Sequence, residues 1–326
     1  MKRRTFLNAS LGSMAAALSA CAPTPLPQHS GAAIAFGTTV SVTVLHQDAG
    51  VARAAIDAAL AQAIHVDRLM SIYDAASQVF ALNRDGTLAR PHADLLAVLR
   101  QAEQLSRLTR GAFDITVQPL WQAFHRAAAA GGLPNEAERR TRRGQVGWKR
   151  VLVDEAAIRL VGRHTAITLN GLAQGYAADL ALAALRPFGI EHALLDTGEF
   201  AARGHNPAQQ PWTLGVADPR DQQAMAAIVR TDGRCLATSG DYAAAFTPDF
   251  AHHHIFDPAT GDSPTELASV SVVAPSAVLA DGLSTAFMVM GAKKSHALAA
   301  TLAGVDLLTI NKRGVVWRSP GFPLAA

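Results

Sequence analysis

Asp281 and Thr285 are the residues whose types and spacing most directly suggest chemistry. They are four positions apart in an apolar segment of helical periodicity, so their oxygens share one helix face. A carboxylate and a hydroxyl so placed suit a hard divalent cation, which takes few protein oxygens and keeps waters or substrate phosphates as its other ligands. On spacing alone, an ordinary hydrogen bond between the two side chains is the simpler explanation.

A strand, a glycine-containing turn and a helix are predicted in succession between Ile167 and Asp179. Backbone amides at the start of such a helix can bind phosphate or pyrophosphate oxygens. The segment matches neither the G-x-G-x-x-G dinucleotide fingerprint nor a Walker motif. Taken alone, a turn of this kind is more often structural than functional.

Three consecutive histidines, His252, His253 and His254, precede an Asp-Pro-x-Thr-Gly turn at residues 257–261. Zinc binding is not favoured, because adjacent side chains of an extended segment point in opposite directions and no second ligand cluster has zinc spacing. One of these histidines as a proton carrier is better supported, because the pKa of imidazole lies near physiological pH.

Phe113 stands two residues after a glycine, in the segment from Gly111 to Leu120. A buried aromatic side chain at a turn usually belongs to the hydrophobic core. The same ring could also lie against a planar ring of a ligand. Both interpretations remain open at this point.

The elements that must position these residues follow from hydrophobic periodicity. Their order neither alternates strictly nor is all-β, which predicts an α+β or mixed α/β body. No linker after Ser30 is long enough to separate independent domains. Helices are expected at 49–70, 93–109, 120–130, 172–185 and 277–290, and strands at 39–45, 151–153, 167–169, 193–195 and 269–274.

Residues 1–20 have the pattern of an export signal. Arg3 and Arg4 form a twin arginine, which is typical of export in the folded state. The apolar stretch that follows, residues 11–20, is too short to span a bilayer. Residues 18–21 resemble a lipobox, which predicts acylation of Cys21; the alternative is an ordinary cleavage site with an incidental cysteine. Residues 21–30, rich in proline and polar residues, are expected to be a tether.

Charge and cysteine content exclude some classes of function. The whole chain has a formal charge of +3 and a pI near 9.1. Removal of residues 1–20, which contain Lys2, Arg3 and Arg4, leaves a formally neutral chain, so the sequence does not favour nucleic-acid binding. The arginines at 139–143 are expected on a solvated helix face or loop. If Cys21 is acylated, Cys235 has no partner for an intramolecular disulfide, and the fold must depend on its core.

The order and spacing of these segments together resemble the ApbE family of FAD:protein FMN transferases (flavinyltransferases). The resemblance covers nearly the whole chain after the signal, and many members of the family are exported lipoproteins. It runs through Phe36-Gly37-Thr38, Ile56-Asp57, Met70-Ser71-Ile72-Tyr73 with Ser77, Leu82-Asn83, Gly111-Ala112-Phe113-Asp114, the turn from Leu169 to Asp179, Thr238-Ser239-Gly240-Asp241-Tyr242, His254-Ile255-Phe256-Asp257-Pro258 with Thr260-Gly261, and Ala280-Asp281 with Thr285.

The resemblance implies a mixed α/β body over residues 31–326, with FAD between two intimate lobes. Asp281 and Thr285 would bind Mg²⁺ through their side chains, and Gly171 through its carbonyl. His254 would be the proton-transfer residue. The implied FAD pocket comprises Phe36, Tyr73, Ala112, Phe113, Asp114, Gln174 and Asp179.

The sequence departs from the common family pattern in three places. Gln174 replaces a frequent lysine, which removes a positive charge near the flavin or its phosphates. A Gly-Gly segment is replaced by the sequence at 196–199, Asp-Thr-Gly-Glu. Phe36 stands where methionine is common. None of these changes affects Asp281, Thr285 or the histidine at 254.

The implied reaction transfers FMN from FAD to a protein. A threonine or serine hydroxyl of the acceptor attacks the FMN-side phosphorus and AMP leaves, with a metal ion to offset charge on the phosphate oxygens. The implied acceptor is a membrane-bound electron-transfer protein with an exported flavinylation motif. The enzyme itself would be exported to the periplasmic side and lipid-anchored to a bacterial membrane; Ala22, in place of aspartate, favours the outer one.

Three other functions are considered. A Mg²⁺-dependent FAD pyrophosphatase would use the same site with water as the nucleophile. A non-catalytic flavin-binding lipoprotein would store or deliver FAD, and Gln174 is the feature that favours it. A redox flavoenzyme is less well supported, because the sequence has no dinucleotide fingerprint for NAD(P)H.

Overall fold

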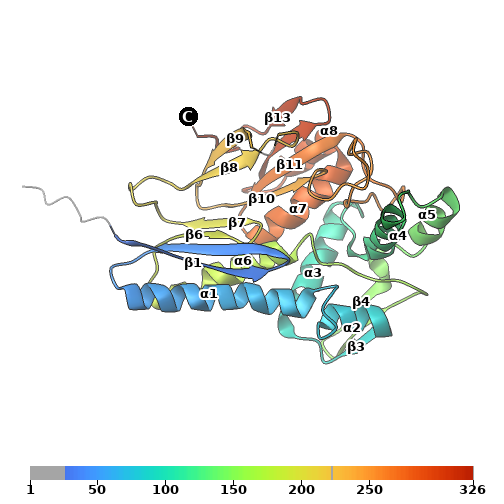
Figure 1. The fold of residues 1–326 in the computed structure, drawn as a ribbon, viewed down its shortest axis with the longest axis horizontal. Coiled ribbons are helices and arrows are strands. Elements are labelled where there is room, and N and C mark those ends of the chain that lie inside the picture. Colours follow the sequence, from blue (N-terminus) through green and yellow to red (C-terminus); the bar gives the residue numbers. More distant parts are fainter. Residues whose placement is uncertain (1–25, 222, 326) are drawn as a thin grey trace, which may run out of the picture.

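The computed structural model describes residues 26–221 and 223–325, and Figure 1 shows their arrangement. The predicted signal peptide, residues 1–20, and the predicted acylation site, Cys21, lie outside the described residues. Within the described part of the chain, no helix combines the length and the apolar character that a membrane span requires.

The main sheet has eight antiparallel strands in the order β1-β2-β6-β7-β10-β11-β12-β13. Every residue of the central strand β11 is buried, because both faces of the sheet are covered there. The strands are β1 (Gln28–Ala35), β2 (Thr38–Leu45), β6 (His192–Asp196), β7 (Phe200–Arg203), β10 (Cys235–Gly240), β11 (Leu267–Ala274), β12 (Asp306–Asn311) and β13 (Val316–Arg318).

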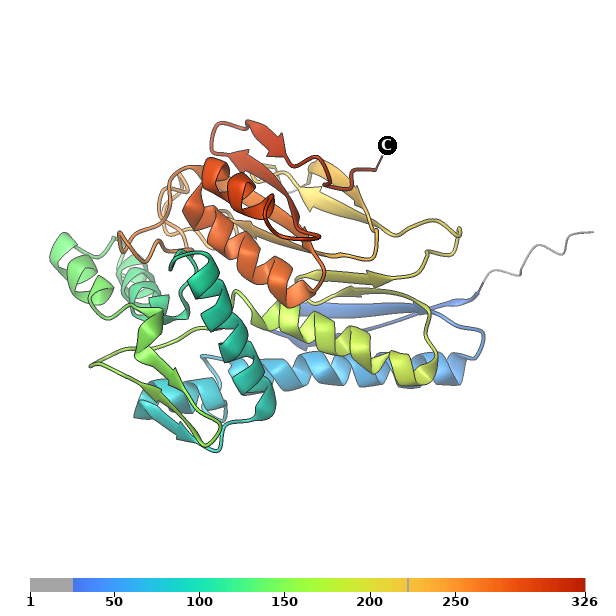
Figure 2. The ribbon, with the colours of Figure 1, turned by 180° about the vertical axis from the view of Figure 1, so that it is seen from behind.

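Three helices, α1 (Ala49–Met70), α6 (Ala173–Ala184) and α7 (Ala277–Met290), cover one face of this sheet (Figure 2). Their buried sides are rich in alanine, and small side chains let neighbouring backbones approach closely. Gly175 shows how tight this packing is, because a Cβ there would lie 2.4 Å from the carbonyl oxygen of Ala277. The short helix α8 (Ala292–Ala299) follows α7.

The opposite face of the sheet is covered in part by a hairpin of β8 (Thr213–Ala217) and β9 (Met225–Arg230). Leu214 and Val229 of the hairpin pack with buried side chains of β10 to β12, including Leu236 and Leu308, in a second apolar cluster. Leu236 of β10 and Val273 of β11 are therefore buried on this face, while their neighbours Ala237 and Val272 are buried in the main core.

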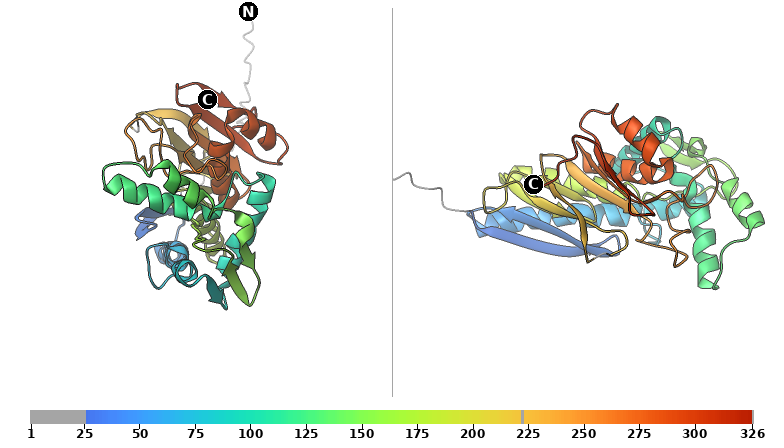
Figure 3. Two further views of the ribbon diagram at one scale, coloured as in Figure 1. Left: turned by 90° about the vertical axis from the view of Figure 1, so that its right-hand side faces the viewer. Right: turned by 90° about the horizontal axis from the view of Figure 1, so that it is seen from above.

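A smaller part of the molecule, between α1 and α6 in the sequence, gathers at one end of the main sheet (Figure 3). It packs onto the sheet part through α3 and α7, where Gly282 leaves no room for a Cβ beside Leu105. The core is continuous across both parts, which confirms the predicted single mixed α/β body. This part contains α2 (Gln78–Asp85), β3 (Thr87–Ala89), α3 (Ala93–Leu108), α4 (Gln118–Ala129), α5 (Glu136–Arg143), β4 (Val151–Val153) and β5 (Ala157–Leu160).

Most predicted elements are confirmed, and the helix expected at 277–290 has those bounds. The strand expected at 167–169 is wrong. The segment is extended, but the side-chain amide of Asn83 bonds both the N–H and the carbonyl of Ile167, so no neighbouring strand is needed. The C-terminal boundary of the predicted tether, residues 21–30, is also wrong, because β1 begins at Gln28 and pairs with β2.

Candidate active site

A cavity of about 510 Å³ lies where the smaller part of the molecule meets the sheet part. Separate segments of the chain line it: the loop before α4, the turn before α6, the loop between β10 and β11, and α7. The β1–β2 turn, the β6–β7 turn and the end of β10 complete the lining. Its size is within the range of small-molecule sites. The cavity brings together most of the predicted site residues, namely Phe36, Ala112, Phe113, Asp114, Gly171, Gln174, His254, Asp281 and Thr285.

A second cavity of about 370 Å³ adjoins the first, because Phe36, Asn170 and Gln174 line both. Tyr73, one of two predicted pocket residues that the first cavity lacks, lies here. Its ring meets the edge of Trp121 with ring centroids 6.1 Å apart. The side chain of Tyr73 is largely exposed, so its ring is available for contact with a planar ligand.

The three predicted cation ligands converge on the larger cavity. One carboxylate oxygen of Asp281 accepts a hydrogen bond from the N–H of Gly175, at 3.0 Å, which leaves the other oxygen for a cation. The backbone of Gly171 lies against Thr285, since a Cβ on this glycine would be 3.0 Å from the threonine hydroxyl oxygen. Carboxylate, hydroxyl and carbonyl oxygens are the ligands that hard divalent cations prefer.

Carboxylates dominate the charge of the larger cavity. Asp114, Glu199 and Asp281 line it, and among the described residues its lining contains no lysine or arginine. Burial raises the pKa of Asp114 and raises that of Glu199 well above its usual value, the latter with a further contribution from Asp281. Burial also raises the pKa of Asp281 to about 7. Buried carboxylates without a cationic partner fit a divalent cation.

His254 lines the same cavity and is chemically distinct from its two neighbours. Its Nδ1 atom is buried and has no hydrogen-bond partner among the described residues. Burial lowers the pKa of His254 below its usual value of 6.5, so the imidazole is neutral at physiological pH. A neutral imidazole facing a ligand cavity can accept a proton.

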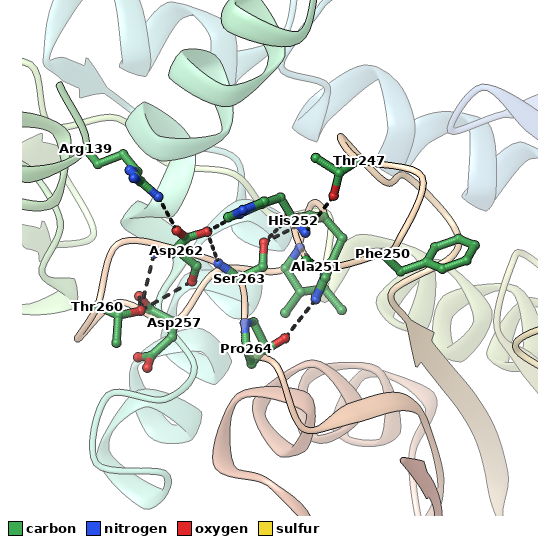
Figure 4. Close-up of polar contacts among 12 residues, drawn as sticks. Arg139, Thr247, Phe250, Ala251, His252, Asp257, Thr260, Asp262, Ser263 and Pro264 are labelled. Carbon is green, nitrogen blue, oxygen red and sulfur yellow. Dashed lines mark hydrogen bonds and ion pairs between the residues drawn. The ribbon is translucent and has the colours of Figure 1, made fainter. Parts of the chain in front are cut away.

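The loop that carries His254 is held by a polar network, which Figure 4 shows around Asp262. The carboxylate of Asp262 pairs with the guanidinium of Arg139 at 2.5 Å and with Nδ1 of His252 at 2.7 Å, and it accepts from the N–H of Ser263. The Ser263 hydroxyl in turn donates to the carbonyl of His253. His252 and His253 therefore position the loop, while His254 faces the cavity.

The arginines at 139–143 lie on or beside α5, as expected for a solvated helix face. Arg139 and Arg142 are only partly exposed, and Arg139 differs from the others in that its guanidinium pairs with Asp262, outside the helix. The remaining arginines of this segment contact acidic residues of the same helix or lie at its end, including the pairs Arg140–Glu136 and Arg142–Glu138.

Two of the departures from the family pattern contact each other. The side-chain amide of Gln174 donates to the carbonyl of Thr197 at 3.0 Å, and the Thr197 hydroxyl donates to the carbonyl of Gln174 at 2.9 Å. Gly198 has a φ of +96°, and a Cβ there would collide with the Gln174 amide. The turn at 197–199 and Gln174 are therefore mutually adapted, and the described residues on this side of the cavity include no positive side chain.

Asp179 does not have the predicted place in the FAD pocket. Its two carboxylate oxygens accept hydrogen bonds from the N–H groups of Ala277 and Val278, at 2.8 and 3.0 Å. Asp179 thus caps the N-terminus of α7, the helix that carries Asp281, because the first amides of a helix have no partner within the helix. The prediction that Asp179 lies in the FAD pocket is therefore wrong, because both of its carboxylate oxygens are bonded to α7.

Glu199 and Ser239 are polar residues of the cavity to which the sequence analysis assigned no role. The carboxylate of Glu199 accepts from the N–H of Thr238 and lies in the cavity close enough to Asp281 to raise its own pKa. The Ser239 hydroxyl lies 3.2 Å from that of Thr285 and 2.7 Å from that of Ser284. The only signal for either was its place in a segment of the family pattern.

Fold and site together define a class: an α+β protein with hard oxygen donors and a neutral histidine around a cavity of nucleotide-binding size. Comparison with known proteins makes this specific. The model of the ApbE family matches residues 36–309. The chain therefore belongs to the ApbE family.

Individual relatives agree with this assignment. The chain is similar to the FAD:protein FMN transferase of Vibrio cholerae serotype O1, with 31% identity over 81% of this chain and 82% of the relative. It is also similar to that of Salmonella typhimurium, with 31% identity over 78% of this chain and 77% of the relative.

Two solved structures are also similar. The ApbE protein from Thermotoga maritima superposes with a TM-score of 0.81 at 28% identity, covering 90% of this chain and 97% of that one. The flavin transferase ApbE from Vibrio cholerae has a TM-score of 0.78 at 27% identity, covering 91% and 99%.

Proposed function

We propose that this chain transfers FMN from FAD to a threonine or serine hydroxyl of an acceptor protein and requires Mg²⁺ for this reaction. The observation that carries the proposal is the convergence of Asp281, Thr285, Gly171 and His254 on one cavity. The names of the relatives support the transfer of flavin from FAD. The donor chemistry of the cavity supports the metal.

In the proposed reaction, each bond that forms or breaks and the proton that moves can be assigned. The acceptor oxygen forms a bond to the FMN-side phosphorus of FAD, the pyrophosphate bond breaks, and AMP leaves with the bond's electron pair. Neutral His254 takes the proton that the acceptor hydroxyl loses. Mg²⁺ held by Asp281, Thr285 and Gly171 would offset negative charge on the phosphate oxygens. The loop network around Asp262 holds His254 in place for this step.

The absence of a lysine makes the metal more important in this chain. Gln174 is bonded to the 197–199 turn, and the lining residues of the cavity that the structure describes include no cationic side chain. A pyrophosphate brings further negative charge to a cavity that already contains Asp114, Glu199 and Asp281. With no cationic side chain among the described lining residues, a divalent cation would supply the strong positive charge that the phosphates of FAD require.

The adjoining smaller cavity is the place proposed for a planar ring of FAD. Tyr73 and Phe36 supply aromatic surface there, and Trp121 supports the ring of Tyr73 from its edge. Phe113 lines the larger cavity beside Gly171. Aromatic side chains stabilise stacked rings through contact area and quadrupole alignment. Tyr73 and Phe36 could therefore stabilise a planar ring of FAD in this cavity.

We further propose that the chain is exported and anchored by an acylated Cys21 on the periplasmic side of a bacterial membrane. The twin arginine, the short apolar stretch and the lipobox-like residues 18–21 support this location. The acceptor would then be an exported domain of a membrane electron-transfer protein. Mass spectrometry of the membrane fraction from cells that express the full chain tests the anchor.

Activity is expected only when FAD, Mg²⁺ and an acceptor are present together. The full-length mature protein is incubated with all three, with EDTA as the control, and both AMP release and the intact mass of the acceptor are followed. A mass gain of one FMN that EDTA abolishes supports the transferase. AMP with free FMN and an unlabelled acceptor would indicate a pyrophosphatase instead, and intact bound FAD would indicate a flavin carrier.

The affinity for Mg²⁺ is expected to depend on pH through Asp281. The pKa of this carboxyl is raised to about 7 in the metal-free protein, so the proton must leave before the cation binds. Affinity should be constant above that pKa and should fall about tenfold per pH unit below it. Calorimetric titration with Mg²⁺ over about pH 5.5 to 8.5 measures this; an affinity independent of pH would contradict the assignment of Asp281 as a ligand.

A further inference from the structure

His65, His92 and Asp94 bring three metal-binding atoms together outside the two cavities. One ring nitrogen from each histidine and one carboxylate oxygen lie within 4.8 Å of one another. Within residues 26–221 and 223–325, this is the one group of three or more histidine, cysteine, aspartate or glutamate side chains arranged so closely. His65 is on α1, and the other two residues stand at the start of α3.

The distances within this group suit a small dication. Nε2 of His65 is 2.8 Å from Oδ2 of Asp94, and Nδ1 of His92 is 3.3 Å from the same oxygen. A tetrahedral zinc ion with bonds of about 2.0–2.1 Å separates its ligand atoms by roughly 3.3 Å. The two imidazole rings are tilted by 60° with centroids 4.9 Å apart, so they are not stacked face to face.

A neighbouring tyrosine holds the carboxylate in a suitable orientation. The hydroxyl of Tyr176 on α6 donates to Oδ1 of Asp94 at 2.7 Å, which leaves Oδ2 directed at the histidines. Ligands of protein metal sites are commonly oriented by a hydrogen bond of this kind.

We propose that His65, His92 and Asp94 bind one transition-metal dication of the zinc class, with the fourth coordination position open to solvent. Two imidazoles and one carboxylate favour Zn²⁺ and related ions, whereas Mg²⁺ prefers oxygen ligands. This site and the cavity around Asp281 therefore select different metals. The side chains are 38%, 45% and 24% exposed, so an ion can reach them.

Metal binding exchanges contacts that the free protein already makes. The ring proton that His65 directs at Asp94 must move to Nδ1, so that Nε2 presents its lone pair. The lone pair on Nδ1 of His92 must leave the N–H of Asp94, a contact of 3.2 Å at the exposed start of α3 that water can replace.

The proposed ion would link two helices directly, α1 and α3, and the hydrogen bond of Tyr176 to Asp94 already connects a third, α6. His65 belongs to α1, Asp94 to α3, and Tyr176 connects the carboxylate to α6. A ligand that binds the folded state alone stabilises it according to its concentration and affinity. The ion should therefore raise the melting temperature of the protein, whether or not the proposed flavin transfer takes place.

The test uses the full mature chain, purified with a tag that contains no histidine, in buffer with excess Mg²⁺ to occupy the cavity around Asp281. Zn²⁺ binding is measured by calorimetry, Co²⁺ binding by its visible absorption, and stability by melting with and without Zn²⁺. The variants are His65→Ala and His92→Ala. His205→Ala is the matched control, because the exposed His205 also stands beside a second histidine, the partly buried His192, with ring centroids 5.6 Å apart. Asp281→Ala is the control for the hard-cation site.

The expected result is one Zn²⁺ per chain with a rise in melting temperature. Binding should weaken at least about tenfold, and the rise should vanish, in His65→Ala and in His92→Ala, because each removes one of three protein ligands. Both should persist in His205→Ala and Asp281→Ala. Unchanged binding in the first two variants, or no Zn²⁺ bound by the unaltered protein, would overturn the proposal. The metal-free melting temperature of each variant reports separately on its folding.

Discussion

Replacement of Asp281 by alanine is expected to lower the rate of AMP release by roughly 1,000-fold or more, since a metal ion contributes several kcal/mol to charge stabilisation in such reactions. Asp281 supplies the one carboxylate of the proposed Mg²⁺ site, and the cavity lining within the described residues has no lysine or arginine to compensate. The measurement is AMP release and acceptor mass at saturating FAD, with Mg²⁺ titration in each variant.

The variant Asp281→Asn distinguishes a loss of metal binding from a loss of folding. Asparagine keeps an oxygen that can accept the hydrogen bond from the N–H of Gly175, which links α7 to the start of α6. It lacks the negative charge that a hard cation requires. We therefore expect Asp281→Asn to fold like the unaltered protein and to be as inactive as Asp281→Ala. Full activity of Asp281→Asn with Mg²⁺ would show that this carboxylate is not a metal ligand.

Replacement of His254 by alanine is expected to lower turnover about 100- to 10,000-fold, the usual contribution of a general base. FAD should still bind, because the cation ligands and the aromatic surface at Tyr73 and Phe36 remain. Single-turnover kinetics of flavin transfer and equilibrium binding of FAD measure the two effects separately. Loss of FAD binding would instead make His254 a residue of the binding pocket.

The pH profile distinguishes a base from a residue that only shapes the cavity. Burial lowers the pKa of His254 below 6.5, so the base form is present at higher pH and is lost as the pH falls through that pKa. Transfer with saturating Mg²⁺ and FAD should therefore decline on the acid side. In His254→Ala the residual rate should lack this decline. If the variant kept the same acid limb, another group would be responsible for it.

The sequence predicts one part of the proposed cation site directly and leaves the other part open. Asp281 and Thr285 lie within one helix, and helical periodicity alone places their oxygens on the same face. The same periodicity predicted α7 with its observed bounds. The family resemblance implied that Gly171 and His254 share the site with Asp281 and Thr285. Periodicity could not show this. Contacts between distant segments depend on how the elements pack, and local spacing contains no information on that packing.

The errors have the same physical origin. The backbone of Ile167 is extended but is bonded by the side chain of Asn83, so an apolar run that resembles a strand belongs to no sheet. Asp179 is in the helix where it was expected, yet its carboxylate is bound by the amides of α7. Gln174 was noted as a substitution, and only the structure shows that it is bonded to the equally unusual Thr197. In each case a long-range hydrogen bond decides the role of a residue.

The sequence by itself determined the apolar patterns of the main helices and of β2, the mixed α/β class and the pairing of Asp281 with Thr285, because these depend on residues close together in the chain. The tertiary structure decided which groups share the cavity, the raised pKa of Asp281, and the grouping of His65 with His92 and Asp94. Burial and charge at a site are set by all the segments packed around it, and only the folded chain brings those segments together.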